Sequence, residues 1–185
     1  EELDDLYYYS IRLGIEKKAQ ELGYEILRVF QNDSLELLKG IDGLIAIGKF
    51  SPVQIQQLEQ YSNHLVFVDS DTLNAGHSCV TVDFEHAVQK VLQHFISSGF
   101  EQIGMIAGQE RTSDQTSIIS DPRLASFQRY LSDKGIFQPD FVKVGNFSSE
   151  SGYQMMTELI NEHKDQLPPA FFISSDALAI GALRA

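Results

Sequence analysis

Polar side chains that could bind a small hydroxylated molecule follow several of the predicted strands. Asp83 comes directly after a short strand over 78–82, and Ser175 and Asp176 come after an apolar strand over 170–174. In open parallel sheets, ligands lie beyond the carboxyl ends of the strands, where the connecting loops converge. A carboxylate can accept hydrogen bonds from two adjacent hydroxyl groups. These positions therefore predict a site for a sugar-like molecule.

The same residue types are also common where helices begin, because their side chains can cap backbone N–H groups. Capping is the more frequent role of such a residue taken alone, so ligand binding and capping stay open as alternatives at each position. The residues concerned are Asp69, Asp83, Ser175 and Asp176.

Arg123 is the basic residue that could complete such a site. It follows Asp121 and Pro122 at the opening of a predicted helix over 122–134. A cation there opposes the helix dipole, so helix stability does not explain its position. A guanidinium can donate to two hydroxyl groups, which favours a ligand-binding role, while a surface salt bridge explains the position equally well.

Aromatic residues could supply a flat apolar surface for a sugar ring. Tyr7, Tyr8 and Tyr9 are consecutive near the start of a predicted helix over 8–22, so they cannot all face the core. Phe147 stands in a predicted loop, where its ring could lie against a pyranose or fill the core.

The sequence offers no catalytic, metal-binding or cofactor-binding pattern. There is no G-x-S-x-G nucleophile motif, no H-E-x-x-H zinc motif and no glycine-rich phosphate loop after a strand. The histidines lack metal-ligand spacing, and His86 and His94 lie off the apolar stripe of their predicted helix, so we expect them to be solvated. We therefore expect neither an enzyme nor a cofactor.

Composition limits the partners of the chain. The 185 residues carry a net charge of -12, which repels phosphate backbones and anionic lipids. Direct contact with DNA would therefore need another segment. The single cysteine, Cys79, permits no disulfide within the chain, and we find neither a membrane-spanning stretch nor a signal peptide. These features fit a cytoplasmic protein.

Helical and strand-like segments alternate, which predicts an α/β fold with parallel sheets. The polar stretch 109–120 lacks periodicity and is interpreted as a loop or a crossing between two lobes. The apolar run 41–47 is interpreted as a strand buried on both faces. The expected helices are 8–22, 52–61, 84–98, 122–134, 149–163 and 176–185, and the expected strands are 25–30, 41–47, 65–69, 78–82, 102–107, 140–145 and 170–174.

Five segments, in order, resemble the LacI/GalR family of transcriptional regulators. The most specific is VTVDFEHAVQKVLQHFISSGFEQIGMIAG at 80–108, a strand, an Asp, a long helix and a second strand that ends in Gly. The others are YYSIRLGIEKKAQELGY at 8–24, IDGLIAIGKFSPVQIQQL at 41–58, DPRLASFQRYLSDKGI at 121–136 and FFISSDALAIGALRA at 171–185.

This resemblance implies a periplasmic-binding-protein-like fold with two Rossmann-like lobes. Residues 1–108 would form the N-terminal lobe without its opening strand, and 109–185 part of the C-terminal lobe. The DNA-binding helix-turn-helix would lie outside the chain. The implied function is a sugar-responsive regulator, a repressor, that binds its effector between the lobes, forms a homodimer and contacts operator DNA through the missing domain.

The resemblance also assigns roles to individual residues. Asp83 would bind a sugar hydroxyl, Arg123 would donate to hydroxyls and Phe147 would stack on the sugar ring. The other implied ligand-binding positions are Asp5, Tyr7, Tyr8, Ser175 and Asp176.

Two other functions are compatible with the same scaffold. A periplasmic sugar-binding protein of a transport system would share the fold, and would be distinguished by an upstream signal peptide instead of a helix-turn-helix. An enzyme acting on sugars or nucleotides would be distinguished by turnover of the bound ligand.

Overall fold

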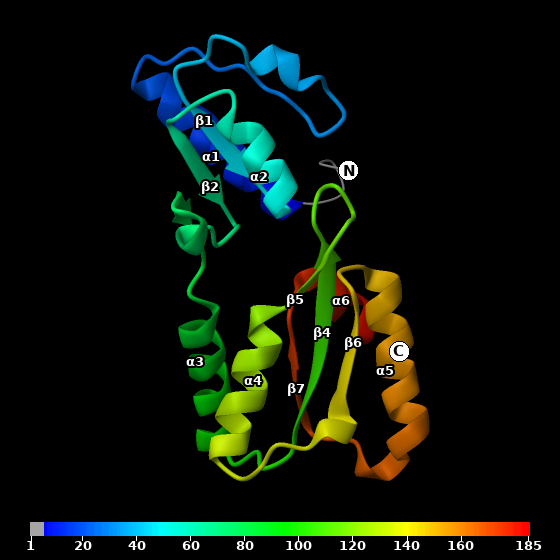
Figure 1. The fold of residues 1–185 in the computed structure, drawn as a ribbon. Coiled ribbons are helices and arrows are strands. Elements are labelled where there is room, and N and C mark those ends of the chain that lie inside the picture. Colours follow the sequence, from blue (N-terminus) through cyan, green and yellow to red (C-terminus); the bar gives the residue numbers. More distant parts are fainter. Residues whose placement is uncertain (1–5) are drawn as a thin grey trace. The chain divides into compact units, whose positions relative to one another are not determined.

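The computed structural model describes residues 6–185, which divide by their contacts into two compact units (Figure 1). Unit 1 comprises the chain up to Val82 together with Thr112–Ser117. Unit 2 comprises Asp83–Arg111 and Ile118–Ala185. This division differs from the expected boundary after residue 108.

Unit 1 contains a three-stranded parallel sheet in the order β1-β2-β3. Its core gathers Ala46 and Phe67 from the strands with Leu58 from a helix. Ser51 caps that helix through a capping box with Gln54, as the Ser-Pro start suggests. The elements are α1 (Leu6–Glu21), β1 (Leu44–Ile47), α2 (Pro52–Glu59), β2 (Leu65–Val68) and β3 (Ser78–Val80), with short 3-10 turns at Leu35–Leu38 and Leu73–Ala75.

Two predictions for unit 1 are wrong. The segment 25–30 forms no strand, and its side chains Ile26, Leu27 and Phe30 are exposed. A strand needs a neighbour for its backbone groups, and none of the described strands pairs with this segment. Strand β1 lies at a sheet edge and Ile45 is 48% exposed, so β1 is not buried on both faces.

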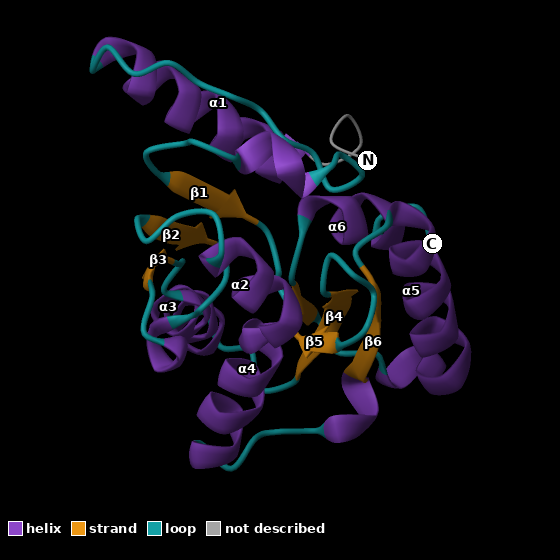
Figure 2. Ribbon diagram, turned by 45° about the horizontal axis from the view of Figure 1, so that its top comes forward, coloured by secondary structure: helices purple, strands orange, loops and turns teal. Residues whose placement is uncertain are grey.

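Unit 2 is a four-stranded sheet covered by helices on both faces (Figure 2). The long strand β4 pairs in parallel with β6 and β7, and its end pairs antiparallel with β5. Helices α3 and α4 pack on one face and α5 and α6 on the other. The elements are α3 (Phe84–Ser97), β4 (Ile103–Arg111), β5 (Ile118–Ser120), α4 (Pro122–Asp133), β6 (Val142–Asn146), α5 (Ser149–His163), β7 (Ala170–Ile173) and α6 (Asp176–Ala182).

Helix α3 explains why the boundary lies before residue 84. Its apolar stripe, which the sequence predicted, buries Val88 and Leu92 completely. These side chains pack against Met105 of β4 and Phe127 of α4, both in unit 2. The hydrophobic contacts of α3 therefore place it with the strand that follows it and not with the strand before it.

The polar stretch 109–120, expected to be a loop or a crossing between two lobes, forms the end of a β-hairpin. Strand β4 continues to Arg111, and Gln109 pairs with Ser120 in the antiparallel ladder. The residues of the hairpin strands are largely exposed, so they lack the alternation of apolar and polar residues that predicts a strand. The tip of this hairpin, Thr112–Ser117, belongs to unit 1 by its contacts.

Candidate functional site

Arg123 lies in the first turn of α4, with its guanidinium close to two phenyl rings of unit 2. Its Cζ atom is 4.4 Å from the ring centroid of Phe84 and 5.3 Å from that of Phe147. Both distances are within the range of attraction between a cation and an aromatic face. The structure thus brings together Arg123 and Phe147, two of the predicted site residues. It adds Phe84, which the sequence analysis missed because a ring at a helix start is usually a packing residue.

Asp121 fixes the orientation of this guanidinium. Its Oδ1 atom accepts the Arg123 backbone N–H at 2.9 Å and the Arg123 Nε–H at 2.6 Å. The Asp121 side chain is fully buried, so the pair is not the surface salt bridge considered from the sequence. Among the residues that the structure describes, none bonds the two Nη atoms of Arg123. The end of the guanidinium is therefore available to a ligand.

The ring of Phe147 lies where the strands of unit 2 end. Phe147 follows β6, and its ring lies so close to Gly108 at the end of the buried part of β4 that a Cβ there would overlap with it. The Gly108 backbone N–H in turn donates to Ser174 Oγ, after β7, at 3.2 Å. The carboxyl ends of three strands therefore meet at this group, as expected for a parallel sheet.

The other predicted residues of unit 2 begin helices. Asp83 caps α3, because its Oδ1 accepts the His86 N–H at 3.0 Å, and Ser175 caps α6. Asp83 and Asp176 have exposed carboxylates. The capping alternative thus holds for Asp83 and Ser175, and ligand binding by these residues stays a prediction.

A different polar cluster lies at the strand ends of unit 1. Tyr7 and Tyr8 donate to the two carboxylate oxygens of Asp69, at 3.2 and 2.8 Å. The Lys49 ammonium lies 2.9 Å from Asp69 Oδ2. Asp69 is 6% exposed and takes a left-handed backbone conformation with φ 66°. Of the predicted residues, Asp5 lies outside the described residues.

Sequence analysis left ligand binding and helix capping open as alternatives for Asp69 and missed Lys49 altogether. Asp69 caps no helix, because its carboxylate is occupied by the two tyrosines and the lysine. The residues that meet here are far apart in the chain, so no local spacing could have revealed the cluster.

The hairpin tip adds a second closed cluster to unit 1. Asp114 accepts from the hydroxyls of Ser51, Thr112 and Thr116 and from the Thr116 backbone N–H. These bonds, the one from Ser51 foremost, hold the pKa of Asp114 far below its usual range. Ser113 donates through both its N–H and its Oγ to the Lys49 carbonyl at 2.8 Å. The tip therefore fixes the backbone that carries Lys49.

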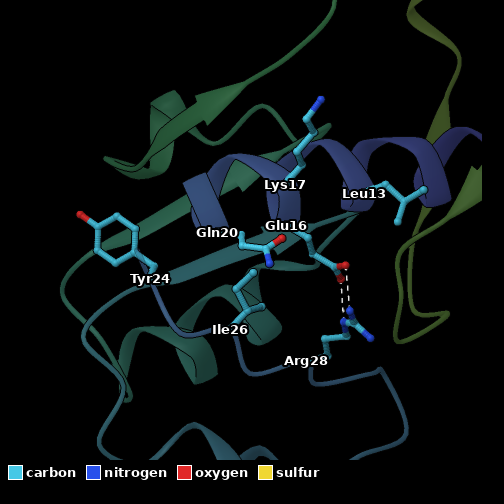
Figure 3. Close-up of a pocket in the computed structure, with 7 residues that line it drawn as sticks. All are labelled: Leu13, Glu16, Lys17, Gln20, Tyr24, Ile26 and Arg28. Carbon is cyan, nitrogen blue, oxygen red and sulfur yellow. Dashed lines mark hydrogen bonds and ion pairs between the residues drawn. The ribbon is translucent and has the colours of Figure 1, made fainter. Parts of the chain in front are cut away.

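A groove of about 440 Å³ on unit 1 contains none of the predicted site residues (Figure 3). Arg28 donates two hydrogen bonds to Glu16 across it, at 2.7 and 2.9 Å. A hydrogen bond from Arg12 is the largest cause that lowers the pKa of Glu16, and a hydrogen bond from Arg28 lowers it further. The groove is lined by Leu13, Glu16, Lys17, Gln20, Tyr24, Ile26 and Arg28.

Residues 6–185 contain no group of three or more His, Cys, Asp or Glu residues arranged to hold a metal ion. They also contain no helix that is both long and apolar enough to span a membrane.

Comparison with known proteins places these features in context. The model of the periplasmic binding protein-like domain matches residues 92–185, just over half of the chain. The HTH-type transcriptional regulator GalR of Streptococcus thermophilus is 52% identical over 184 residues, which cover 100% of this chain and 55% of the relative. The regulator GalR of Lacticaseibacillus casei is 33% identical over 186 residues, 100% of this chain and 56% of the relative.

The fold also matches a solved structure. The lac repressor dimer bound to operator and the anti-inducer ONPF superimposes with a TM-score of 0.78 at 24% identity, over 97% of this chain and 64% of that one. The chain spans about half the length of the curated relatives it matches. Those relatives are named as transcriptional regulators, and nothing in these comparisons favours the transport alternative. The chain belongs to the periplasmic binding protein-like domain family, in the form found in LacI/GalR-type transcriptional regulators.

Proposed function

We propose that this chain is the effector-binding part of a sugar-responsive transcriptional regulator, a repressor. The observation that carries the proposal is the guanidinium of Arg123, which lies over the rings of Phe84 and Phe147 with its Nη atoms unbonded by any described residue. A cation held in place with open donors can recognise adjacent hydroxyl groups. The kinship with GalR-type regulators supports the regulatory role.

The proposed sugar contacts in unit 2 follow from chemistry. Arg123 donates to two hydroxyl oxygens, and Phe147 offers its ring to the apolar face of the sugar. Asp83 and Asp176, whose carboxylates are exposed, accept from hydroxyl groups, and Ser175 contributes its hydroxyl. Asp5, Tyr7 and Tyr8 of unit 1 remain proposed ligand residues; the hydroxyls of the two tyrosines donate to Asp69, so they would bind a sugar as acceptors.

DNA binding belongs, in this proposal, to a helix-turn-helix outside these 185 residues. A net charge of -12 disfavours direct contact between this chain and a phosphate backbone. The regulator acts as a homodimer in the cytoplasm. Sugar shifts the affinity for operator DNA only to the extent that it binds the two conformations of the regulator unequally.

Titration calorimetry with the full chain tests sugar binding. We expect one or more of D-glucose, D-galactose, lactose and sucrose to bind, and Arg123→Ala to weaken that binding by about 30-fold or more, because two charge-assisted hydrogen bonds are lost. Arg129→Ala is the matched control, since Arg129 lies on the same helix but is exposed and pairs with Glu85. Equal affinities in wild type and Arg123→Ala would contradict the proposal.

A second experiment tests regulation. Operator duplexes are selected from random DNA by the full-length protein, and their binding is followed by fluorescence anisotropy with and without the sugar. We expect the sugar to change operator affinity in the wild type but not in Arg123→Ala. A sugar that binds and leaves operator affinity unchanged would contradict a regulatory role while leaving the binding site intact.

A further inference from the structure

We infer that Asp121 neutralises and orients Arg123, so that the site selects uncharged sugars over phosphorylated ones. This inference rests on the proposed function, because it names the class of ligand that the Arg123 site takes. Asp121 itself does not contact the ligand, since its side chain is completely buried. It acts through Arg123 as a positioning residue.

The orientation of the guanidinium is set by three contacts. Its Nε–H points at Asp121 Oδ1 at 2.6 Å, and the rings of Phe84 and Phe147 lie 4.4 and 5.3 Å from its Cζ. With Nε occupied, only the end of the guanidinium remains for a ligand. Two parallel donors on that end match two neighbouring oxygen acceptors, such as the hydroxyls of a sugar.

The carboxylate of Asp121 forms its hydrogen bonds with Arg123 alone among the described residues. Its Oδ1 accepts both bonds from Arg123, while its Oδ2 is buried without a partner in the described part of the chain. Arg123 is the only described residue that donates to the Asp121 carboxylate, so Asp121 and Arg123 form a pair with no net charge.

The surrounding groups add negative charge. Asp83 at the start of α3 and Asp176 at the start of α6 have exposed carboxylates. Farther along β4, Glu110 and Arg111 carry opposite charges that offset one another. The strand ends of unit 2 therefore offer donors to a ligand without a surplus of positive charge.

This balance discriminates between two classes of sugar. A free sugar accepts hydrogen bonds from Arg123 and brings no charge. A sugar phosphate brings a charge of about -1.5 to -2, which Asp121, Asp83 and Asp176 repel. Arg123 alone would attract a phosphate, so the carboxylate of Asp121 decides the preference.

The test compares wild type with Asp121→Asn in the full chain. Calorimetry measures the affinities for D-glucose, D-galactose and their 6-phosphates. Asparagine preserves the shape and the oxygen that caps α4 but removes the charge. We expect the wild type to bind free sugars more tightly, and the variant to shift the ratio of phosphate to free-sugar affinity by about tenfold or more towards the phosphates.

Two further variants separate charge from structure. Asp133→Asn removes the same charge from the exposed end of α4, and we expect its affinity ratio to stay within about twofold of wild type. Asp121→Ser, which keeps a capping hydroxyl without charge, should shift the ratio as Asp121→Asn does. A purely structural role would lower both affinities and the melting temperature together and leave the ratio unchanged, which would overturn the inference.

The remaining outcomes distinguish the inference from the proposed function. A wild type that prefers the phosphates overturns the inference and leaves sugar binding intact. If the wild type binds none of the four compounds and neither lactose nor sucrose, the proposed function is contradicted, but the gain of phosphate binding in Asp121→Asn would still support the charge effect. If neither protein binds any of these compounds, both the proposed function and the inference are wrong.

Discussion

The polar clusters at the strand ends of the two units differ in whether their hydrogen bonds are closed. In unit 1, both oxygens of Asp69 are occupied, by Tyr7, Tyr8 and Lys49. In unit 2, the guanidinium of Arg123 is paired through Nε only, and no described residue bonds its Nη atoms. A closed cluster stabilises the fold, whereas an open one still has donors to give to a ligand.

The helices of the two units differ in how tightly they are packed, and here unit 2 is the more tightly closed. Helix α1 of unit 1 buries none of its residues. In unit 2, α5 and α6 approach so closely that a Cβ at Gly152 would overlap with the Leu178 carbonyl, and one at Gly181 with that of Ser149. Unit 2 therefore holds its open polar site on a tightly packed frame.

Removal of the Asp69 carboxylate should have the largest effect on stability. Asp69→Ala removes the carboxylate that pairs with the largely buried ammonium of Lys49 and accepts hydrogen bonds from two phenols. It also puts alanine into a left-handed conformation. We expect a loss of about 3–4 kcal/mol in the free energy of unfolding, measured by urea denaturation.

Asp69→Asn is the matched comparison. Asparagine tolerates the left-handed conformation and keeps one acceptor oxygen, so we expect about half of that loss. A change of less than about 1 kcal/mol in Asp69→Ala would show that the cluster does not stabilise unit 1.

Substitution in the packed frame of unit 2 should have the next largest effect. In Gly181→Ala the new methyl group meets the backbone of Ser149 and Tyr153, which cannot rotate away. We expect α6 to shift and the free energy of unfolding to fall by about 2–3 kcal/mol, measured by urea denaturation. An unchanged unfolding midpoint would mean that α5 and α6 are less tightly packed than these contacts indicate.

Sequence patterns predicted the elements of this fold that depend on local periodicity. Helices α3, α4 and α5 lie over the ranges predicted for them, α3 from its apolar stripe, and the parallel strands lie between them as the alternation required. The strand predicted over 25–30 was wrong, and the stretch 109–120, expected to be a loop or a crossing between lobes, has paired strands at both ends, because pairing between strands depends on tertiary contacts. The division by contacts likewise differs from the expected boundary after 108, since only tertiary packing assigns α3 to unit 2.

The candidate site could be predicted where a single residue matches a ligand-binding position of the family. Arg123 and Phe147 were selected in that way and lie together in the structure. Asp121 and Phe84 were not, because their roles depend on where the Arg123 side chain lies. Residue type and spacing can suggest a donor, but they do not show which of its atoms are occupied.

The loosely packed helix α1 should tolerate change and even gain from it. Gly14 is exposed in the interior of α1, and a Cβ there would meet no atom within 4 Å. Gly14→Ala should raise the free energy of unfolding by about 0.5–1 kcal/mol, because alanine loses less backbone entropy in a helix. Thermal unfolding followed by circular dichroism measures this gain, and destabilisation would show that α1 has a partner at this position.

The smallest expected effect is a pH-dependent change in stability at the second closed cluster of unit 1, the one around Asp114. Hydrogen bonds from Ser51, Thr112 and Thr116 hold the pKa of Asp114 below its value in the unfolded chain, about 3.9. A group with a lowered pKa stabilises the fold above its unfolded pKa, and that contribution is lost as the pH falls towards its folded pKa. Wild type should therefore exceed Asp114→Asn in urea midpoint by a constant margin between about pH 5 and 7, and this margin should shrink below about pH 4. A margin that stays constant down to about pH 3 would mean that the carboxylate of Asp114 is not what closes this cluster.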